Sequence, residues 1–597
     1  MYIGGLSKEV IRSLIATALG REKADLVLKS ISLVNVYTGE ILENVDVAVK
    51  NGRIAYVGSN ADHTIGSFTK VVKGKGKFLI PGFLDAHIHI ESSMLTPLHF
   101  SEAVLPHGTT GVFVDPHEIA NVLGKEGVKY FIEEAKLAPI RIFVEVPSCV
   151  PATPEDITGG RLGPREVREL LEDPYTIGLG EVMDFHGVLS LRKDILEKIA
   201  EAHKLNKVVD GHAPALSDKH LAAYVASGIT SDHESVEAWE VIEKARLGMY
   251  VMLREGSAWR DLDKTIKAII NHNIDVHMIV FDTDDRNPYD IVYEGHMDYI
   301  VRRAIELGLD PIKAVQMATI NVARRFKVED HIGGIAPSKL ADFIILKNLE
   351  KVVIEMVFVN GNLLVKNGKS LWKPPENYKI PKHLYNTINI KRMLLPEDFK
   401  LKAPISSGIV KARVIGIVPN KAITKHLVLD VRVENGEVVS DTERDILKIA
   451  MVERYTGEGK VGLGLVHGFG FKYGALASSI AHDSHNILVV GVSEDDMAHA
   501  VNKLVEVGGG IIFVANKKTE ALVELPVAGI LSDKPAEVVA EKLRKLTETV
   551  RKAGSKIDEP YMTLSILGLI VIPELRVFNK GLFDVSKNSV VNVFVEQ

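Results

Sequence analysis

The sequence has few of the features that mark secreted, membrane or nucleic-acid-binding proteins. It contains one cysteine, Cys149, among 597 residues, which excludes an intramolecular disulfide framework and a cysteine-rich zinc site. The formal net charge is −6 and no long basic block occurs, so nothing favours nucleic-acid binding electrostatically. The most apolar late segment, residues 564–572, is too short to cross a bilayer. We therefore expect a cytoplasmic protein that binds neither nucleic acid nor membrane.

What is present is ordinary for a globular protein of several domains. Hydrophobic residues make up 46% of the chain and charged residues 25%. A chain of 597 residues is too long for one core, so three or four domains are expected. The N-terminal segment predicts a short amphipathic helix rather than a signal peptide, because Lys8, Glu9 and Arg12 interrupt its apolar positions.

Two segments of similar β character flank a long middle region. Short β-branched runs occupy residues 25–75 and 340–370, with Asn-Gly turn signals at 51–52, 360–361 and 367–368. This pattern predicts one small β-sandwich domain, split into residues 1–76 (which include the N-terminal helix) and 336–370. Residues 371–404 are Pro-rich and polar and predict a linker. Residues 405–597 alternate strands and helices and predict a separate α/β domain.

The middle region, residues 77–335, predicts a (β/α)8 barrel of the TIM type. Eight apolar, strand-like runs alternate with helical patterns over this region, which is the signature of that fold. The runs are residues 78–89, 109–117, 141–148, 176–184, 207–214, 229–234, 249–256 and 276–285. The overall fold class is therefore α/β.

Six polar residues stand at the ends of these runs. His87 and His89 are separated by one residue, so on a strand both side chains point the same way. Since the carboxyl ends of all barrel strands meet on one face, we expect these six side chains to converge there. They are His87, His89, Glu181, His212, His233 and Asp284. Four imidazoles and two carboxylates are a complete ligand set for two divalent metal ions, and Glu181 can bridge them.

Each of these residues also has an ordinary explanation when it is considered alone. His212 can be a loop histidine, and His233 can cap the start of a helix. Glu181 can be an ion-pair partner, and Asp284 can belong to an Asx-turn. The metal-site interpretation depends on six such residues occurring together at strand ends.

Several motifs resemble the amidohydrolase superfamily and, within it, the bacterial and archaeal adenine deaminase family. PGFLDAHIHIESS at 81–93, HGTT at 107–110 and IGGIAPSKLADFIIL at 332–346 resemble the superfamily. Other segments are similar to the adenine deaminase family and extend the resemblance over nearly the whole chain. They are VDPHEIANVLG (114–124), GLGEVMDF (178–185), LREGS (253–257), FDTDDR (281–286) and SSIAHDSHNILVVG (478–491).

The resemblance implies how the ligands divide and which reaction they serve. His87, His89 and Asp284 would hold one metal ion, and His212 and His233 the other, with Glu181 bridging where many superfamily members use a carbamylated lysine. Manganese or iron is implied in preference to zinc. The implied reaction is hydrolytic deamination of adenine, a small-molecule substrate, to hypoxanthine and ammonia. We also expect a homo-oligomer, with a dimer favoured.

Further residues are candidates for catalysis, substrate binding and closure of the site. Asp284 would act as base as well as ligand, and a second group must donate to a ring nitrogen of the substrate. The candidates near that face are Glu118 and Glu255 for catalysis, and His117, Arg254, Ser257 and Asp285 for substrate binding. His482, Asp483 and His485 form a polar cluster in the last domain that we expect to act as a lid.

Two other functions remain open from the sequence. A cyclic-amide hydrolase, such as a dihydroorotase or hydantoinase, would share the metal ring, but those enzymes normally carry a lysine where Glu181 stands. A catalytically silent barrel scaffold would be expected to have lost ligands, and none of the six is missing.

Overall fold

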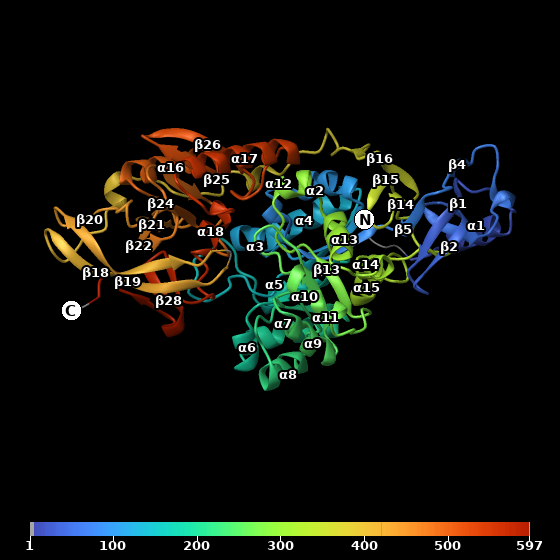
Figure 1. Cartoon of the computed structure of the whole chain (residues 1–597), viewed down its shortest axis with the longest axis horizontal. Helices are drawn as coiled ribbons and strands as arrows, with labels where there is room; N and C mark the ends of the chain where they lie inside the picture. Colours follow the sequence, from blue (N-terminus) through green and yellow to red (C-terminus); the bar gives the residue numbers. More distant parts are fainter. Residues whose placement is uncertain (1–4, 420, 596–597) are drawn as a thin grey trace.

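A computed structural model describes residues 5–419 and 421–595, and it places three regions side by side along the long axis of the molecule (Figure 1). The strand–helix region that begins near residue 83 lies in the middle, between a small β-sheet region and the C-terminal region (Figure 1). Residues 1–4, 420 and 596–597, which fall within the predicted first and last domains, lie outside the described residues.

Eight parallel strands form the middle region, one within each predicted run. They are β6 (Phe83–Ile88), β7 (Thr109–Val114), β8 (Arg141–Val146), β9 (Thr176–Val182), β10 (Val208–Gly211), β11 (Ser231–Asp232), β12 (Tyr250–Arg254) and β13 (Ile279–Asp282). The first five pair in the order β10-β9-β8-β7-β6, and the last three in the order β11-β12-β13. Backbone hydrogen bonds from His89 N–H to Asp284 and from Asp284 N–H to His87, both 3.0 Å, join β6 to the end of β13.

Helices follow most of these strands. They are α2 (Pro97–Val104), α3 (His117–Leu123), α4 (Lys125–Leu137), α5 (Pro164–Leu171), α6 (Phe185–Leu189), α7 (Lys193–Lys204), α8 (Asp218–Ala226), α9 (Ala238–Arg246), α10 (Leu262–Thr265), α11 (Lys267–Ile270), α12 (Pro288–Tyr293), α13 (Met297–Glu306), α14 (Pro311–Met317) and α15 (Ile320–Arg325). Asp310 caps α14 by accepting hydrogen bonds from two backbone N–H groups, as expected of Asp before Pro at a helix start.

The strands carry a layered arrangement of side chains, because residues two apart share a face. Phe113, Phe143, Val208 and Val280 belong to one apolar cluster with Phe326, whose ring stacks on that of Phe113. Two residues further along each strand, buried carboxyl groups follow this layer at Asp115, Glu145, Asp210 and Asp282. Two residues after Asp115, Asp210 and Asp282, the chain carries His117, His212 and Asp284. The polar face therefore lies on top of a packed core.

The first predicted run contains two strands that belong to different sheets. β5 (Phe78–Pro81) pairs with β1 (Leu26–Asn35) and with β14 (Phe343–Asn348), whereas β6 joins the middle region. Gly82 separates them, and a Cβ atom there would lie 2.1 Å from Oγ1 of Thr110. The close approach of the two sheets thus requires glycine at the Pro-Gly break.

The two β-rich flanks meet in one nine-stranded sheet. Its other strands are β2 (Glu40–Lys50), β3 (Arg53–Gly58), β4 (Lys70–Lys73), β15 (Val353–Val359), β16 (Asn362–Lys366) and β17 (Lys369–Ser370). Asn51-Gly52, Asn360-Gly361 and Asn367-Gly368 all have positive φ, as two-residue hairpin turns require. α1 (Lys8–Ala18) packs on β3 and is capped by the Ser7 side chain.

The C-terminal region is built on a second nine-stranded sheet that is antiparallel except where β18 pairs with β22. Its strands are β18 (Gly408–Ile417), β19 (Thr424–Glu434), β20 (Glu437–Val438), β21 (Ile446–Val452), β22 (Val461–His467), β23 (Ala475–Ser478), β24 (Ile487–Gly491), β25 (Gly510–Ala515) and β26 (Lys518–Glu524). The helices are α16 (Glu494–Val507), α17 (Ala536–Lys552) and α18 (Pro560–Ile566), and a small sheet comprises β27 (Leu575–Phe578), β28 (Gly581–Asp584) and β29 (Ser589–Val591).

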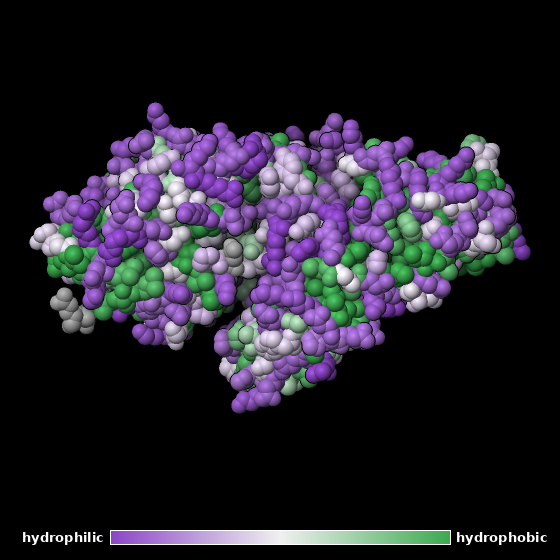
Figure 2. Space-filling view, viewed as in Figure 1, coloured by the Kyte–Doolittle hydropathy of each residue, from purple (hydrophilic) through white to green (hydrophobic). Residues whose placement is uncertain are grey.

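The visible face of the molecule is largely polar, with apolar areas near both ends, and a notch separates the C-terminal region from the lobe that carries α6 and α8 (Figure 2). Among the described residues, none of the helices combines the length and the apolar character that crossing a membrane requires.

Candidate metal centre

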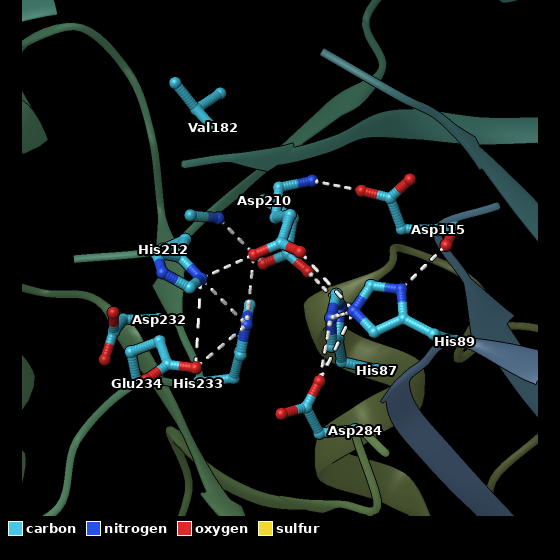
Figure 3. Close-up of polar contacts among 12 residues, drawn as sticks. His87, His89, Asp115, Val182, Asp210, His212, Asp232, His233, Glu234 and Asp284 are labelled. Carbon is cyan, nitrogen blue, oxygen red and sulfur yellow. Dashed lines mark hydrogen bonds and ion pairs between the residues drawn. The ribbon is translucent and has the colours of Figure 1, made fainter. Parts of the chain in front are cut away.

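The six predicted ligands converge at the carboxyl ends of the parallel strands. Figure 3 labels five of them, His87, His89, His212, His233 and Asp284. The Nε2 atoms of His87 and His89 lie 3.2 Å apart, and the Oδ1 atom of Asp284 lies 3.3 Å from Nε2 of His89. Nδ1 of His212 lies 3.4 Å from Nε2 of His233. Five of the six side chains are buried, and His212 retains about 25% of its side-chain exposure. Histidines and carboxylates from β6, from β9 and from the segments directly after β6, β10, β11 and β13 thus form one polar cluster.

Glu181 occupies the centre of this cluster, with one carboxylate oxygen on each side. Its Oε1 lies 3.4 Å from Nε2 of His89, whereas its Oε2 lies 2.6 Å from Nδ1 of His212 and 3.2 Å from Nε2 of His233. Burial would raise the pKa of Glu181, but His212 and His233 outweigh it and hold that pKa well below its ordinary value. This geometry matches a carboxylate that bridges two cations.

Asp284 is held in place by its backbone and by Arg254. Its φ of 52° lies in the left-handed region, which is unusual for a residue other than glycine and is typical of functional sites. The Arg254 guanidinium donates to Oδ2 of Asp284 at 2.9 Å, so Oδ1 is left to face His89 and His87. Arg254, which we predicted to bind substrate, is therefore already paired with Asp284, Glu234 and Asp261.

The outer ring nitrogens of His87 and His89 face oxygen atoms, so their inner nitrogens point toward the cluster. Nδ1 of His89 lies 2.9 Å from the backbone oxygen of Asp115, so it carries the proton and Nε2 presents a lone pair. Nδ1 of His87 lies 3.3 Å from Oδ2 of Asp210. Oε2 of Glu181 is buried, and its short contacts with His212 and His233 do not have hydrogen-bond geometry. Lone pairs that face one another without protons between them fit divalent cations, so the residues present suit a metal centre.

His117 and Glu118 lie beside the cluster and connect it to the C-terminal region. Nδ1 of His117 lies 3.6 Å from Oε1 of Glu181, and its Nε2 lies 3.4 Å from Oε1 of Glu118. The Glu118 carboxylate contacts Nδ1 of His482 and Nε2 of His485. Burial would raise the pKa of Glu118, but the three histidines hold it well below its ordinary value. Burial would lower the pKa of His482, but the Glu118 carboxylate outweighs it and raises that pKa to about 9.

The remaining predicted residues occupy different positions. Asp483 approaches His117, with 3.9 Å between Oδ1 and Nε2. Asp285 accepts a hydrogen bond from the Ser92 hydroxyl. Ser257 supports the loop after β13 rather than the cluster, because its hydroxyl accepts the Asn287 N–H at 3.0 Å and its N–H donates to the backbone oxygen of Asp285.

Glu255 is not brought to the cluster. It follows Arg254 on the strand, and since neighbouring residues on a strand point to opposite faces, it is directed away from Asp284. Its Oε2 accepts the Leu262 N–H at 3.3 Å, and it lines a separate open pocket with Arg260 and Tyr299. Burial raises the pKa of Glu255 to about 7. Nothing in this geometry supports the catalytic role that the sequence suggested.

Three cluster residues were missed by the sequence analysis. Asp210 contacts His87, Asp115 accepts the Glu181 N–H at 2.8 Å through Oδ2, and Glu234 lies 3.9 Å from both His212 and His233 (Figure 3). The signal for two of them was present. Asp115 and Asp210 each precede a predicted site histidine by two residues, so the alternation of a strand places them on the same face.

Comparison with known proteins assigns the family. A model of the amidohydrolase family matches residues 78–364, and a model of the adenine deaminase C-terminal domain matches residues 421–589. The chain is 43% identical to an adenine deaminase of Clostridium botulinum over 592 residues, covering 99% of this chain and 98% of that protein. It is 46% identical to adenine deaminase 3 of Rhizobium meliloti over 591 residues, covering 98% and 99%. The chain belongs to the adenine deaminase family.

The likeness to adenine deaminases extends over the middle and C-terminal regions alike, because the matched relatives are covered almost completely. Solved structures are less similar: a beta-aspartyl dipeptidase of Fervidobacterium islandicum matches with 18% identity and a TM-score of 0.44, covering 58% of this chain and 97% of that one. The amidohydrolase family is metal-dependent, and several groups of His, Asp and Glu side chains in this structure lie close enough to bind metal ions.

Proposed function

We propose that this protein is a metal-dependent hydrolase that deaminates adenine to hypoxanthine and ammonia. The observation that carries this proposal is the position of Glu181 between two sets of histidines, in a chain that matches named adenine deaminases over 97–99% of its length. The middle region serves as a (β/α)8 barrel that gathers the site, the split sheet packs beside it, and the C-terminal region covers its polar face.

Two divalent cations would be held by the side chains already described. His87, His89 and Asp284 suit one cation, His212 and His233 suit the other, and Glu181 suits both. A ligand set of nitrogen and oxygen atoms without thiolate suits manganese, iron or zinc. The resemblance to the adenine deaminase family favours manganese or iron among these. When bound, such cations lower the pKa of water from about 15.7 to about 7, which supplies a nucleophile at neutral pH.

Asp284 is suited to moving the proton of the reacting water. Its Oδ1 faces the cluster while Arg254 fixes Oδ2, so the carboxylate has one free oxygen in a fixed orientation. Oδ1 would accept the proton of the attacking water and pass it toward the departing amino nitrogen. Arg254 positions this base and does not itself meet the substrate in our proposal.

His117 and Glu118 are suited to assisting the purine ring. Attack at the ring carbon that carries the amino group places negative charge on a neighbouring ring nitrogen, which requires a hydrogen-bond donor. His117 lies between Glu181 and Glu118 and can offer an N–H group from Nε2 toward that side of the site. Glu118, paired with His482 and His485, would keep His117 protonated by its negative charge.

Ammonia release from a small panel of compounds tests this function directly. Adenine should be turned over, whereas adenosine, cytosine and dihydroorotate should not, and the same sample should contain about two equivalents of divalent metal. Turnover of dihydroorotate without turnover of adenine would favour the cyclic-amide hydrolase instead. A metal-replete protein inactive on every compound would favour the scaffold.

The dimer and the cytoplasmic location expected from the sequence stay predictions. Gel filtration with light scattering would measure the first, and cell fractionation the second.

A further inference from the structure

The two groups of ligands suited to the two cations differ in how the strands support them. His87 lies within β6, and two backbone hydrogen bonds of 3.0 Å join the end of this strand to Asp284. On the other side of the cluster, His212 follows the end of β10, and His233 follows β11, which is only two residues long. Pairing between strands therefore fixes His212 and His233 less firmly, and contacts from neighbouring helices must hold them.

Tyr224 holds the segment that carries His212. It lies on α8 and is completely buried. Its hydroxyl accepts the His212 N–H at 2.9 Å and donates to the backbone oxygen of Val182 at 2.6 Å. Val182 directly follows Glu181, whose Oε2 lies 2.6 Å from Nδ1 of His212. One buried hydroxyl thus joins His212 to the strand that carries the bridging carboxylate.

Asp232 holds the segment that carries His233, the next residue in the chain. Its Oδ1 accepts the N–H of Ala213, which follows His212, at 2.7 Å. Its Oδ2 accepts the ammonium group of Lys244, on α9, at 2.6 Å, and both side chains of this ion pair are completely buried. Figure 3 shows Asp232 on the same side of the cluster as His212 and His233. The Asp232 carboxylate therefore joins the two histidine segments to each other and to α9.

The opposite side of the cluster has a buried support of its own. Asp85, two residues before His87, accepts the Thr283 N–H at 3.0 Å and the Thr283 hydroxyl at 2.6 Å. Thr283 directly precedes Asp284 in the chain. The hydrogen bonds that support the two sides of the cluster thus come from different residues.

We propose that the Tyr224 hydroxyl and the Asp232 carboxylate are positioning groups for one cation only, the one suited to His212 and His233. This inference rests on the two-cation centre of the proposed function and adds that separate parts of the fold hold the two cations. Groups that orient metal ligands typically change the metal affinity by about 10–100-fold when they are removed. Loss of the Tyr224 hydroxyl should therefore weaken one cation and spare the other.

The substitution Tyr224→Phe tests this, because it removes one oxygen atom and keeps the ring. Calorimetric titration of the metal-free protein with Mn²⁺ would give the affinity of each equivalent. We expect one equivalent to bind about 10–100-fold more weakly than in wild type and the other to stay within about twofold. Equal weakening of both equivalents would show that the hydroxyl supports the whole cluster and would overturn the assignment.

Tyr130→Phe is the matched control. Tyr130 is also a buried tyrosine, and its hydroxyl donates to Oε1 of Glu134 at 2.7 Å, away from the cluster. Because each variant loses one buried hydrogen bond, the Tm of the metal-free protein should fall by similar amounts in both. Only Tyr224→Phe should lose Mn²⁺ affinity, which a merely structural role of the hydroxyl does not predict.

Variants with one ligand removed identify which cation is affected. His89→Asn keeps the ligands of the second cation, and His233→Asn keeps those of the first. Adding Tyr224→Phe should weaken Mn²⁺ binding by about 10–100-fold in the His89→Asn protein and leave it within about twofold in the His233→Asn protein. Adding Thr283→Val should have the reverse effect. An effect of Tyr224→Phe only in the His233→Asn protein would contradict the proposal.

The outcomes separate this inference from the proposed function. If wild-type protein takes up no Mn²⁺, the two-cation centre of the proposed function fails. If it takes up two equivalents and Tyr224→Phe binds both with wild-type affinity, the positioning role is wrong and the centre stands. Should Tyr224→Phe fail to fold, Ser235→Ala replaces it, because the Ser235 hydroxyl donates to Oδ2 of Asp232 at 3.0 Å. Wild-type affinity for both equivalents in that variant would overturn the inference as well.

Discussion

Nδ1 of His87 lies 3.3 Å from Oδ2 of Asp210, and both side chains are completely buried. Burial would raise the pKa of Asp210, but His87 and Arg325 outweigh it and lower that pKa. A carboxylate in this position keeps the proton on the outer nitrogen of the imidazole and orients its inner nitrogen toward the metal centre. The relationship gives Asp210 a role in metal binding although it is not itself among the predicted ligands.

The substitution Asp210→Asn should weaken metal binding without abolishing the fold. It retains the size of the side chain but loses the charge that orients His87, and such changes typically cost about 10–100-fold in metal affinity. Titration of the metal-free protein with Mn²⁺ would measure this.

A matched control is Asp298→Asn. Asp298 is also a buried carboxylate beside a histidine, with 3.2 Å between its Oδ1 and Nδ1 of His107, but this pair lies outside the metal centre. It should leave the Mn²⁺ affinity within about twofold of wild type. Equal affinities for the Asp210 variant and for wild-type protein would show that His87 needs no orienting carboxylate.

Glu181→Gln should change the metal stoichiometry. Because each oxygen of Glu181 faces a different set of histidines, replacing one oxygen by an amide NH2 group removes a ligand from one cation only. We expect the metal content to fall from about two equivalents to about one, and kcat to fall by about 10³-fold or more. Elemental analysis of purified protein, with wild type and Asp298→Asn beside it, measures the metal content; retention of two equivalents would contradict the bridging role.

The predicted strand ends explain why most of the site could be located from the sequence. His87, His89, Glu181, His212 and Asp284 follow apolar runs, and parallel strands bring their carboxyl ends together without further information. The same alternation that aligned His87 with His89 also aligns Asp210 with His212, so the carboxyl layer beneath the ligands was predictable by extending the period of two backward along each strand.

Other features depend on contacts that sequence patterns do not encode. The split of the first run at Gly82 follows from pairing of β5 with β14, a strand more than 250 residues away. The contact of Glu118 with His482 and His485 depends on how the C-terminal region packs on the middle region. Whether Arg254 or Glu255 faces the site depends on the register of a single strand, and a shift of one residue would exchange them.

The contact between Glu118 and His482 should make thermal stability depend on pH. The pKa of His482 is about 9 in the folded protein, against about 6.5 for an unfolded chain, so its contribution is complete below about pH 6.5 and is lost as the pH rises through 9. The contribution is on the order of 3 kcal/mol. The pKa of Glu118 is lowered, so the same contact also weakens when the pH falls below about 4.

Calorimetry between pH 7 and pH 10 tests this dependence. Wild-type protein should lose several degrees of Tm over this range, and His482→Asn should lose less, because it lacks the titrating group. His277→Asn is the control, since His277 is exposed on the surface, where its Nδ1 lies 3.0 Å from Oδ1 of Asp275. A wild-type decline that His482→Asn reproduces in full would assign the pH dependence to another group.

Glu255 and Glu118, two carboxyl groups that the sequence placed in equivalent roles, should behave differently on substitution. Glu255→Gln should keep kcat/KM within about twofold of wild type, because the side chain accepts the Leu262 N–H on the face opposite to Asp284. Since burial raises the pKa of Glu255 to about 7, a neutral glutamine replaces a group that is about half neutral already.

Glu118→Gln should instead lower kcat by about 100-fold or more while keeping bound metal, because it removes the charge that faces His117, His482 and His485. Steady-state kinetics and metal analysis on both variants decide the matter, and a large loss of turnover in Glu255→Gln would place that carboxylate back in the catalytic site.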